Sequence, residues 1–349
     1  MNFSSDNVTG VCPEIAAAVH GANKGPAMPY GADDATSNVE TAIKKLFQCE
    51  ADVFLLSTGT AANVLALSVL CPPYGSIYCH PKAHIEIDEC GGPEFYTGGA
   101  KLVLLPDRAG KISANDLADA LKNEHGDIHH VKPAVVSLTQ TGETGAVYSI
   151  DEIKAITDIA HNHNMKVHMD GARFANAVVA LGCSAAETSC KAGVDILSFG
   201  ASKNGAFAAE AVVIFTPGLA KDFAYRRKRG GHLFSKMRFL AAQFEAYLKD
   251  DLWLKTAHHA NDCMDTLAQG LSEIKDVEVL IPPDANMLFA RLPNRMITNL
   301  RAKGFSFYDW PGEDRSTIRL VTAFNTNKED CVSFAREVRK ISELHYDDP

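Results

Sequence analysis

Short apolar runs rich in β-forming residues alternate with stretches of helical periodicity, and this alternation constrains the fold more than any other feature of the chain. Apolar runs of this length are typical of strands buried on both faces, and their alternation with helices predicts a mostly parallel, doubly wound sheet. The seven predicted strands are residues 53–56, 76–79, 101–105, 134–138, 166–169, 196–199 and 212–215.

Three short motifs mark predicted helix starts. In a capping box, a Ser or Thr at the N-cap and a Glu three residues later satisfy backbone N–H groups of the first turn. Segments 37–40, 149–152 and 326–329 have this form, and each precedes apolar residues at helical spacing. We therefore expect helices to begin at Ser37, Ser149 and Thr326.

The pattern changes after about residue 242. A long helical stretch gives way to predicted strands at 277–281, 287–291 and 317–321, with helices between them. This order indicates a smaller α+β domain at the C-terminal end. We predict an N-terminal arm over residues 1–40, a large α/β domain over 41–245 and a small domain over 246–349.

One segment tests whether the chain crosses a membrane. Residues 53–81 contain no Asp, Glu, Lys or Arg, and a membrane span needs roughly 20 apolar residues. However, polar residues 57–60 and Asn63 lie near its start, Pro72 and Pro73 interrupt it, and polar groups are costly in lipid. A buried strand followed by a buried helix is the better interpretation, so we expect no membrane partner.

Charge and cysteine content limit the possible partners further. The 34 basic and 43 acidic residues give a net charge of −9, which argues against a nucleic-acid surface. The basic run at 226–229 is an exception, most simply a solvated helix face. Nine cysteines occur without a CxxC pair and without a signal peptide, so we expect free thiols, no metal site and a cytoplasmic location.

The first segment that can carry chemistry is Thr-Gly-Thr-Ala-Ala-Asn at residues 58–63, between a predicted strand and a predicted helix. Backbone N–H groups at a helix start converge on one point and carry partial positive charge, which suits a phosphate. Gly59 would let a ligand approach the backbone, and Thr60 would add a donor. Alone, the segment is a weak signal, because a Ser/Thr/Gly helix start is usually an ordinary cap.

Asp170 comes at the end of another predicted strand, within His-Met-Asp-Gly-Ala-Arg at 168–173. The carboxyl ends of parallel strands are where α/β sheets bind ligands. A carboxylate there could pair with the pyridine nitrogen of pyridoxal 5'-phosphate (PLP) and hold that nitrogen protonated. Capping of the following helix is the alternative role.

Lys203 follows the predicted strand at 196–199. Because an ammonium is expensive to bury, a lysine just after a buried strand has two interpretations. It either extends from a loop to solvent or supplies an amine that forms a Schiff base with a carbonyl compound.

A phosphate-type turn, a strand-end aspartate and a later lysine occur in the order found in PLP enzymes of the aspartate aminotransferase fold. The surrounding blocks resemble the threonine aldolase family, and the likeness covers nearly the whole chain. This resemblance implies a PLP-dependent transferase-like fold, with a seven-stranded, mostly parallel sheet flanked by helices and a smaller α+β domain. The matching blocks are residues 5–9, 30–40, 59–63, 83–85, 168–173, 198–203 and 318–322.

The resemblance also implies roles in cofactor binding. Lys203 would carry PLP as a Schiff base, and Asp170 would bond the ring nitrogen. Gly59 and Thr60 would bind the phosphate. His84 would stack on the ring and stand near the β-hydroxyl of the substrate, where it is our choice of catalytic base.

The substrate carboxylate would be held by Arg173 and Arg319 together with Ser5, since a guanidinium binds a carboxylate through two hydrogen bonds. Arg173 would also contact the cofactor. A surface ion pair is the alternative role of Arg319.

Two departures from the family pattern affect the site. Where members often carry Glu-Asn-Thr-His, this chain has Thr-Gln-Thr-Gly at 139–142, so a second active-site histidine is missing. Residues 226–236 resemble the branch of low-specificity threonine and phenylserine aldolases, in which Arg229 and His232 would lie near the cofactor.

The resemblance implies reversible cleavage of small β-hydroxy-α-amino acids such as L-threonine, L-allo-threonine and phenylserine to glycine and an aldehyde, in a homotetramer built as a dimer of dimers. Two alternatives remain. One is another PLP reaction, β-elimination or transamination, since fold alone does not separate these. The other is a catalytically silent PLP-binding or scaffold protein.

Overall fold

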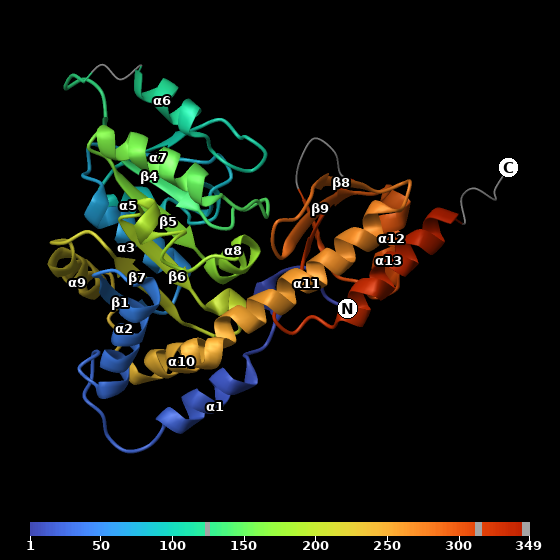
Figure 1. The fold of residues 1–349 in the computed structure, drawn as a ribbon, viewed down its shortest axis with the longest axis horizontal. Coiled ribbons are helices and arrows are strands. Elements are labelled where there is room, and N and C mark those ends of the chain that lie inside the picture. The colour runs from blue at the N-terminus through green and yellow to red at the C-terminus, as the bar shows by residue number, and fades with distance from the viewer. Residues whose placement is uncertain (123–125, 311–315, 344–349) are drawn as a thin grey trace.

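The computed structural model describes residues 1–122, 126–310 and 316–343, and Figure 1 shows a larger and a smaller lobe joined by a long helix. All seven predicted strands of the first two thirds are present and form one sheet in the order β1-β7-β6-β5-β4-β2-β3. They are β1 (Asp52–Leu56), β2 (Gly75–Cys79), β3 (Lys101–Leu104), β4 (Lys132–Thr139), β5 (Lys166–Gly171), β6 (Ile196–Gly200) and β7 (Glu210–Ile214).

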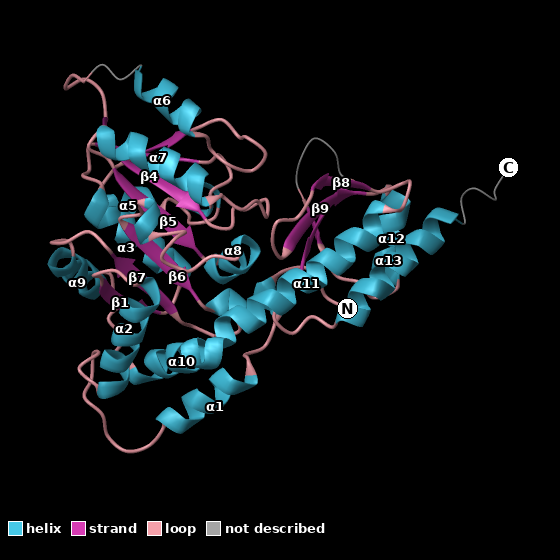
Figure 2. Ribbon diagram, viewed as in Figure 1, coloured by secondary structure: helices cyan, strands magenta, loops and turns pink. Residues whose placement is uncertain are grey.

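The sheet is parallel except at β7. Strand β7 runs antiparallel to both of its neighbours, β1 and β6, whereas the pairs β2–β3, β2–β4, β4–β5 and β5–β6 are parallel. Figure 2 shows the strands inside the larger lobe with helices on both sides. The predicted fold class is confirmed.

The helices around the larger sheet have at most 14 residues. The two longer helices, α11 and α13, reach into the smaller lobe. The helices are α1 (Pro13–Ala22), α2 (Asp34–Phe47), α3 (Gly59–Leu70), α4 (His84–Ile87), α5 (Gly92–Thr97), α6 (Ala114–Lys122), α7 (Ile150–Asn162), α8 (Phe174–Leu181), α9 (Ala220–Arg229), α10 (Arg238–Leu248), α11 (Leu252–Ser272), α12 (Asn294–Ala302) and α13 (Lys328–Glu343).

Successive side chains of the strands enter two different cores, as the two-residue repeat of a strand requires. Leu55 and Val213 lie in the core under α2, α7 and α10. Leu56 and Val212 lie in the core under α3 and α9 on the opposite face. Both faces of the sheet are therefore buried, which explains why the strands are continuous apolar runs.

The uncharged segment 53–81 forms β1, α3 and β2. Residues 61–68 of α3 are all buried, and a helix that is apolar on every side lies in the interior of a protein or in a membrane. Here α3 packs against the sheet and α5. Among the described helices none is long and apolar enough to cross a membrane.

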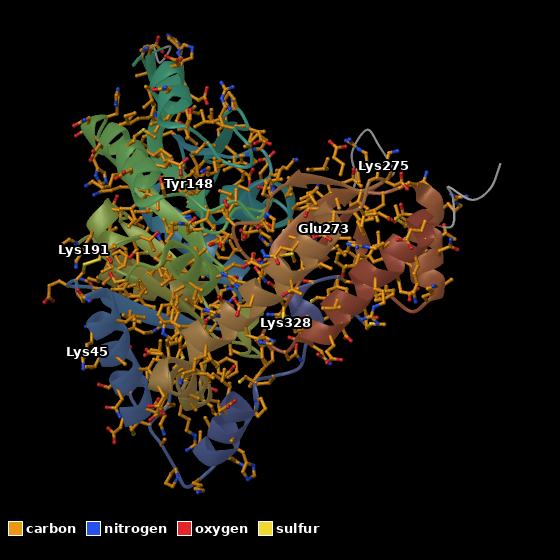
Figure 3. All side chains as sticks on the ribbon, turned by 45° about the vertical axis from the view of Figure 1, so that its right-hand side comes forward. Lys45, Tyr148, Lys191, Glu273, Lys275 and Lys328 are labelled. Atoms are coloured by element: carbon orange, nitrogen blue, oxygen red, sulfur yellow. A yellow bond between two sulfur atoms is a disulfide. The ribbon has the colours of Figure 1, made fainter. Side chains whose placement is uncertain are left out.

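The smaller lobe contains an antiparallel sheet in the order β10-β11-β9-β8, with its own core. Figure 3 labels Glu273 and Lys328 at the ends of the two long helices that cover it, α11 and α13, whereas Lys45, Tyr148 and Lys191 lie in the larger lobe. The strands are β8 (Glu278–Ile281), β9 (Met287–Arg291), β10 (Tyr308–Asp309) and β11 (Thr317–Val321).

Helix α11 belongs to both lobes. Its residue Ala257 packs in the core of the larger lobe, and its residue Cys263 packs in the core of the smaller one. The predicted boundary near residue 245 stays a prediction.

The N-terminal segment crosses between the lobes. Phe3 lies in the core of the smaller lobe, with its ring centroid 5.5 Å from that of Phe334. Helix α1 then packs against α10 on the larger lobe (Figure 1). The segment between them carries residues 5 and 6 past the end of the large sheet.

One of the three predicted helix starts is confirmed, and two are wrong. Ser149 and Glu152 form the predicted capping box of α7. However, α2 begins a turn earlier than Ser37, because Asp33 accepts the capping bond from the Thr36 N–H. Helix α13 begins after Asn327, whose side chain accepts from the Glu329 N–H, so Thr326 is not its cap. Asp and Asn cap helices as well as Ser and Thr do.

The expectation of free thiols is wrong for one pair. Cys49, just after α2, and Cys190 form a disulfide with a Cα–Cα distance of 6.9 Å. They are 141 residues apart in sequence, so only the packing of α2 beside the segment before β6 brings them together. Among the described residues, the other seven cysteines are free thiols.

Candidate active site

Asp170 lies at the carboxyl end of β5, between β4 and β6. Its carboxylate is buried, with 4% of the residue exposed. Oδ1 accepts from the Ala172 N–H at 3.0 Å, and Oδ2 accepts from Asn63 Nδ2 at 2.8 Å. Among the described residues, no basic side chain forms an ion pair with it. Helix α8 has Arg173 as its N-cap, so Asp170 bonds the turn before that helix.

Lys203 lies in the short 3-10 helix η3 (Ser202–Asn204), which follows β6. It is half-buried. Its ammonium lies near enough to His84, Asp6 and Glu210 to influence the ionisation of each. Asp170 influences both His84 and Glu210. Lys203 and Asp170, on which the PLP interpretation depends, therefore lie close to the same two side chains, His84 and Glu210.

The predicted phosphate turn forms the start of α3. Thr58 is the N-cap, and its hydroxyl accepts from the Ala61 N–H at 3.2 Å, so the capping interpretation is confirmed for Thr58. Gly59 and Thr60 are the first helical residues, whose N–H groups have no partner within an α-helix. A Cβ placed on Gly59 would meet nothing within 4 Å, which leaves room for an anionic ligand at the positive end of this helix.

His84 is the first residue of α4. Its Nδ1 lies 2.9 Å from Oε1 of the buried Glu89, and 28% of its side chain is exposed. The hydrogen bond to Glu89 raises the pKa of His84 against the opposing effect of burial. The Nδ1 edge of the His84 ring is therefore held by Glu89, while part of the side chain remains accessible from outside.

Arg173 is engaged by a residue to which the sequence analysis assigned no role. Its Nε and Nη2 donate to the two carboxylate oxygens of Asp6 at 2.7 and 3.0 Å. Burial alone would raise the pKa of Asp6, but Arg173 and Lys203 outweigh that effect and lower it. The hydroxyl of neighbouring Ser5 accepts from the Asn7 N–H at 3.1 Å. Any contact of Arg173 with a substrate is thus made by a guanidinium already paired on one edge.

Arg319 of β11 points toward the same region. Its guanidinium lies over the rings of Tyr308 and Trp310, and Nη2 donates to the Ser4 carbonyl at 3.2 Å. Its Nε is buried and has no acceptor among the described residues. Since buried donors are rarely left unpaired, this group fits an anionic ligand such as a carboxylate and argues against a surface ion pair.

These observations fit PLP. Asp170 is a buried carboxylate without a cation among the described residues, as a protonated ring nitrogen would require. The start of α3 offers backbone donors for a phosphate, and Lys203 supplies an amine near Asp6 and His84. The donor set matches the group that the sequence predicts.

His168 and Glu210 lie behind the site. The imidazole of His168 is bonded on both sides, by Ser137 at 2.9 Å and Ser198 at 3.1 Å, and burial lowers its pKa to about 4. Burial raises the pKa of Glu210 to about 7, although a hydrogen bond from Ser202 opposes the shift. Both side chains are therefore neutral over part of the acid range, where their unfolded forms are charged.

We expect these two groups to give folding stability opposite pH dependences. On acidification, unfolded His168 takes up a proton from about pH 6.5 and the folded form only near 4, so its contribution to stability falls. Folded Glu210 takes up a proton near 7, before the unfolded form at 4.5, so its contribution rises. In Glu210→Gln, the free energy of unfolding in urea should fall by about 2 kcal/mol more than in the wild type between pH 7 and 5.

The matched variant for this measurement is His168→Asn. Between pH 6.5 and 5, its free energy of unfolding should fall by about 2 kcal/mol less than that of the wild type. Parallel curves for wild type and Glu210→Gln at all pH values would contradict a neutral buried Glu210.

The two departures from the family pattern have clear places in the fold. Strand β4 ends at Thr139, and Gly142 lies in the following turn, where its N–H donates to the Ala146 carbonyl. Arg229 is exposed at the end of α9. Within the described part of this chain, neither Arg229 nor His232 forms a hydrogen bond or ion pair with Lys203 or Asp170. In the same basic run, Arg227 stacks on Phe54 at 5.0 Å.

Three polar residues of the site, Asp6, Asn63 and Glu89, were not predicted from the sequence. Each lies within or near a segment that resembles the threonine aldolase family, and this position was the only indication of a role. Glu89, however, cannot be distinguished in sequence from Glu86 and Asp88, which are exposed. Only the fold shows which of the three acids is buried.

Known proteins resemble this chain over nearly its full length. The model of the beta-eliminating lyase family matches residues 2–293. A low specificity L-threonine aldolase of Pseudomonas aeruginosa is 45% identical over 97% of this chain and 97% of its own length. A second one, from a Pseudomonas species, is 42% identical with the same coverage.

Solved structures agree with these matches. The threonine aldolase of Leishmania major superposes with a TM-score of 0.92 at 28% identity, covering 98% of this chain and 99% of that one. A structure of Oryza sativa TDC with PLP and tryptamine superposes with a TM-score of 0.77 at 12% identity, covering 99% of this chain and 83% of that one, and shows a shared fold. By its sequence and by the extent of the matched region, the chain belongs to the beta-eliminating lyase family.

Proposed function

We propose that this protein is a PLP-dependent threonine aldolase that cleaves β-hydroxy-α-amino acids to glycine and an aldehyde. The observation that carries the proposal is the gathering of Asp170, Lys203 and His84 at the carboxyl edge of the sheet, in a chain 45% identical to a low specificity L-threonine aldolase. When bound, PLP supplies a protonated ring that accepts the electron pair released as the Cα–Cβ bond breaks.

The residues of the chain would hold that cofactor from three sides. Lys203 is its covalent attachment point. Asp170, fixed by two hydrogen bonds, keeps the ring nitrogen protonated. The backbone at Gly59 and Thr60 binds the phosphate at the start of α3.

Substrate orientation would select which bond breaks. Arg319 Nε, with Ser5 and the paired Arg173, holds the substrate carboxylate at one end of the site. Held in this way, the substrate would have a single orientation in the site, in which the Cα–Cβ bond is the one that breaks. His84 takes the proton from the β-hydroxyl through Nε2, directly or through a water, and the aldehyde leaves. A proton returned to Cα completes glycine.

We expect the purified enzyme to release glycine and acetaldehyde from L-threonine or L-allo-threonine, and glycine and benzaldehyde from phenylserine. Aldehyde is assayed by coupled reduction with NADH, and keto acid is assayed in parallel. A keto acid without glycine would indicate the alternative, an aminotransferase or another β-eliminating lyase, and would contradict the aldolase proposal.

Assembly and location are part of the same proposal. By resemblance to the threonine aldolase family, the chain forms a homotetramer, a dimer of dimers, acts in the cytoplasm and has a small amino acid as its partner. Residues 1–40 would act as an arm, 41–245 as the cofactor-binding domain and 246–349 as the small domain.

A further inference from the structure

Glu89 is a fully buried carboxyl group close to the site. Its side chain has 0% exposure, and among the described residues no lysine or arginine pairs with it. Burial raises the pKa of Glu89, against the hydrogen bonds from His84 and Asn63. Burying a carboxylate costs folding free energy, so we look for a functional role of Glu89.

One oxygen of Glu89 connects two parts of the site. Oε1 lies 2.9 Å from His84 Nδ1 and 2.8 Å from Asn63 Nδ2. The same Nδ2 lies 2.8 Å from Asp170 Oδ2. Because carboxylate oxygens only accept, the two N–H bonds of the Asn63 amide serve the two acids. A continuous chain of hydrogen bonds therefore runs from His84 to Asp170.

The chain of bonds fixes the state of His84. An ionised Glu89 accepts from Nδ1–H, so the neutral ring keeps its hydrogen on Nδ1 and its lone pair on Nε2. Nε2 is then a proton acceptor on the ring's open edge. The third member of a Ser-His-Asp triad orients its histidine in the same way.

We propose that Glu89 is a positioning residue that holds His84 with Nε2 as the proton acceptor and, through Asn63, holds Asp170 against the cofactor ring. The inference rests on the proposed function, since it assigns His84 the base role in aldol cleavage. It also makes a statement about the imidazole itself, which can be tested whether or not the aldolase reaction is found.

The test is Glu89→Gln, which keeps the shape of the side chain and removes its charge. We expect kcat to fall roughly 10- to 100-fold with KM within about twofold, as for other groups that orient a reacting residue. The matched control is Glu86→Gln on α4, the helix that carries His84. Glu86 is an exposed carboxylate, so this variant should behave as the wild type.

The second readout is the ionisation of His84 in the cofactor-loaded enzyme. Its reaction with diethyl pyrocarbonate is followed against pH by peptide mass spectrometry, since only the neutral ring reacts. The charged groups that act on His84 are Glu89, Asp170 and Lys203. Loss of the Glu89 charge should move the midpoint to lower pH, whereas Glu86→Gln should not move it.

Two outcomes overturn the inference: an unchanged kcat, or a lower kcat with an unmoved His84 midpoint, which would mean a purely structural role. If Glu89→Gln fails to fold, Asn63→Ser decides. It removes the amide that joins Glu89 to Asp170 and leaves the bond between Glu89 and His84 in place. The dissociation constant for PLP should therefore rise roughly tenfold or more while the His84 midpoint stays. An unchanged dissociation constant would refute the link. A wild type that makes no glycine fails the proposed function but leaves the His84 midpoint test intact.

Discussion

Lys203→Ala should lower kcat for aldol cleavage by roughly 10⁴-fold or more, because losing the covalent group of a catalytic set costs rates of that order. Alanine has no amine to attach the cofactor or to displace the product. The lysine also carries the positive charge that acts on Asp6, His84 and Glu210. We would measure glycine formation from phenylserine, with PLP in excess so that weaker binding alone does not limit the rate.

The matched control is Lys221→Ala, which removes an exposed lysine from α9. It should leave kcat within about twofold, since surface substitutions away from a site rarely act on it. Absorbance of the two purified variants provides a second comparison: only Lys203→Ala should lose the band of the lysine-bound cofactor. A Lys203→Ala enzyme with wild-type turnover would refute the role proposed for this amine.

Asp6→Ala should lower the free energy of unfolding by about 3–5 kcal/mol, the usual loss when one partner of a buried ion pair is removed. Asp6 is 1% exposed and Arg173 4%, so the remaining guanidinium cannot be solvated without opening the fold. Asn286 would also lose its hydrogen bond to Asp6 Oδ2. Urea denaturation of the wild type and the variant at pH 7 measures the difference.

Two comparisons separate an unpaired charge from general damage. The double variant Asp6→Leu with Arg173→Met leaves no buried charge and should recover most of the lost stability. Glu273→Ala breaks an exposed pair with Arg339 and should cost about 1 kcal/mol or less. An Asp6→Ala protein as stable as the wild type would show that Arg173 finds another partner.

The fold class could be predicted because its determinants are local. A strand buried on both faces must be a short apolar run, and Val53, Met169 and Val213 each lie in such a run and reach the core. The site residues that could be predicted are those near the ends of such strands. Asp170 lies at the carboxyl end of β5, and Lys203 comes just after β6. Their chemistry depends on position along the chain, which a sequence records.

Other features required the tertiary structure, because they join residues far apart in the chain. Asp6 meets Arg173 across 167 positions and Cys49 meets Cys190 across 141, and no local pattern selects one partner among many. Burial is likewise a property of the packed chain, so Glu89 could not be distinguished from its exposed neighbour Glu86. The sequence by itself determined the strands, the lysine and the aspartate, since these depend on neighbours along the backbone. Which charges are paired and which are removed from water was decided only when the two lobes and the N-terminal segment packed together.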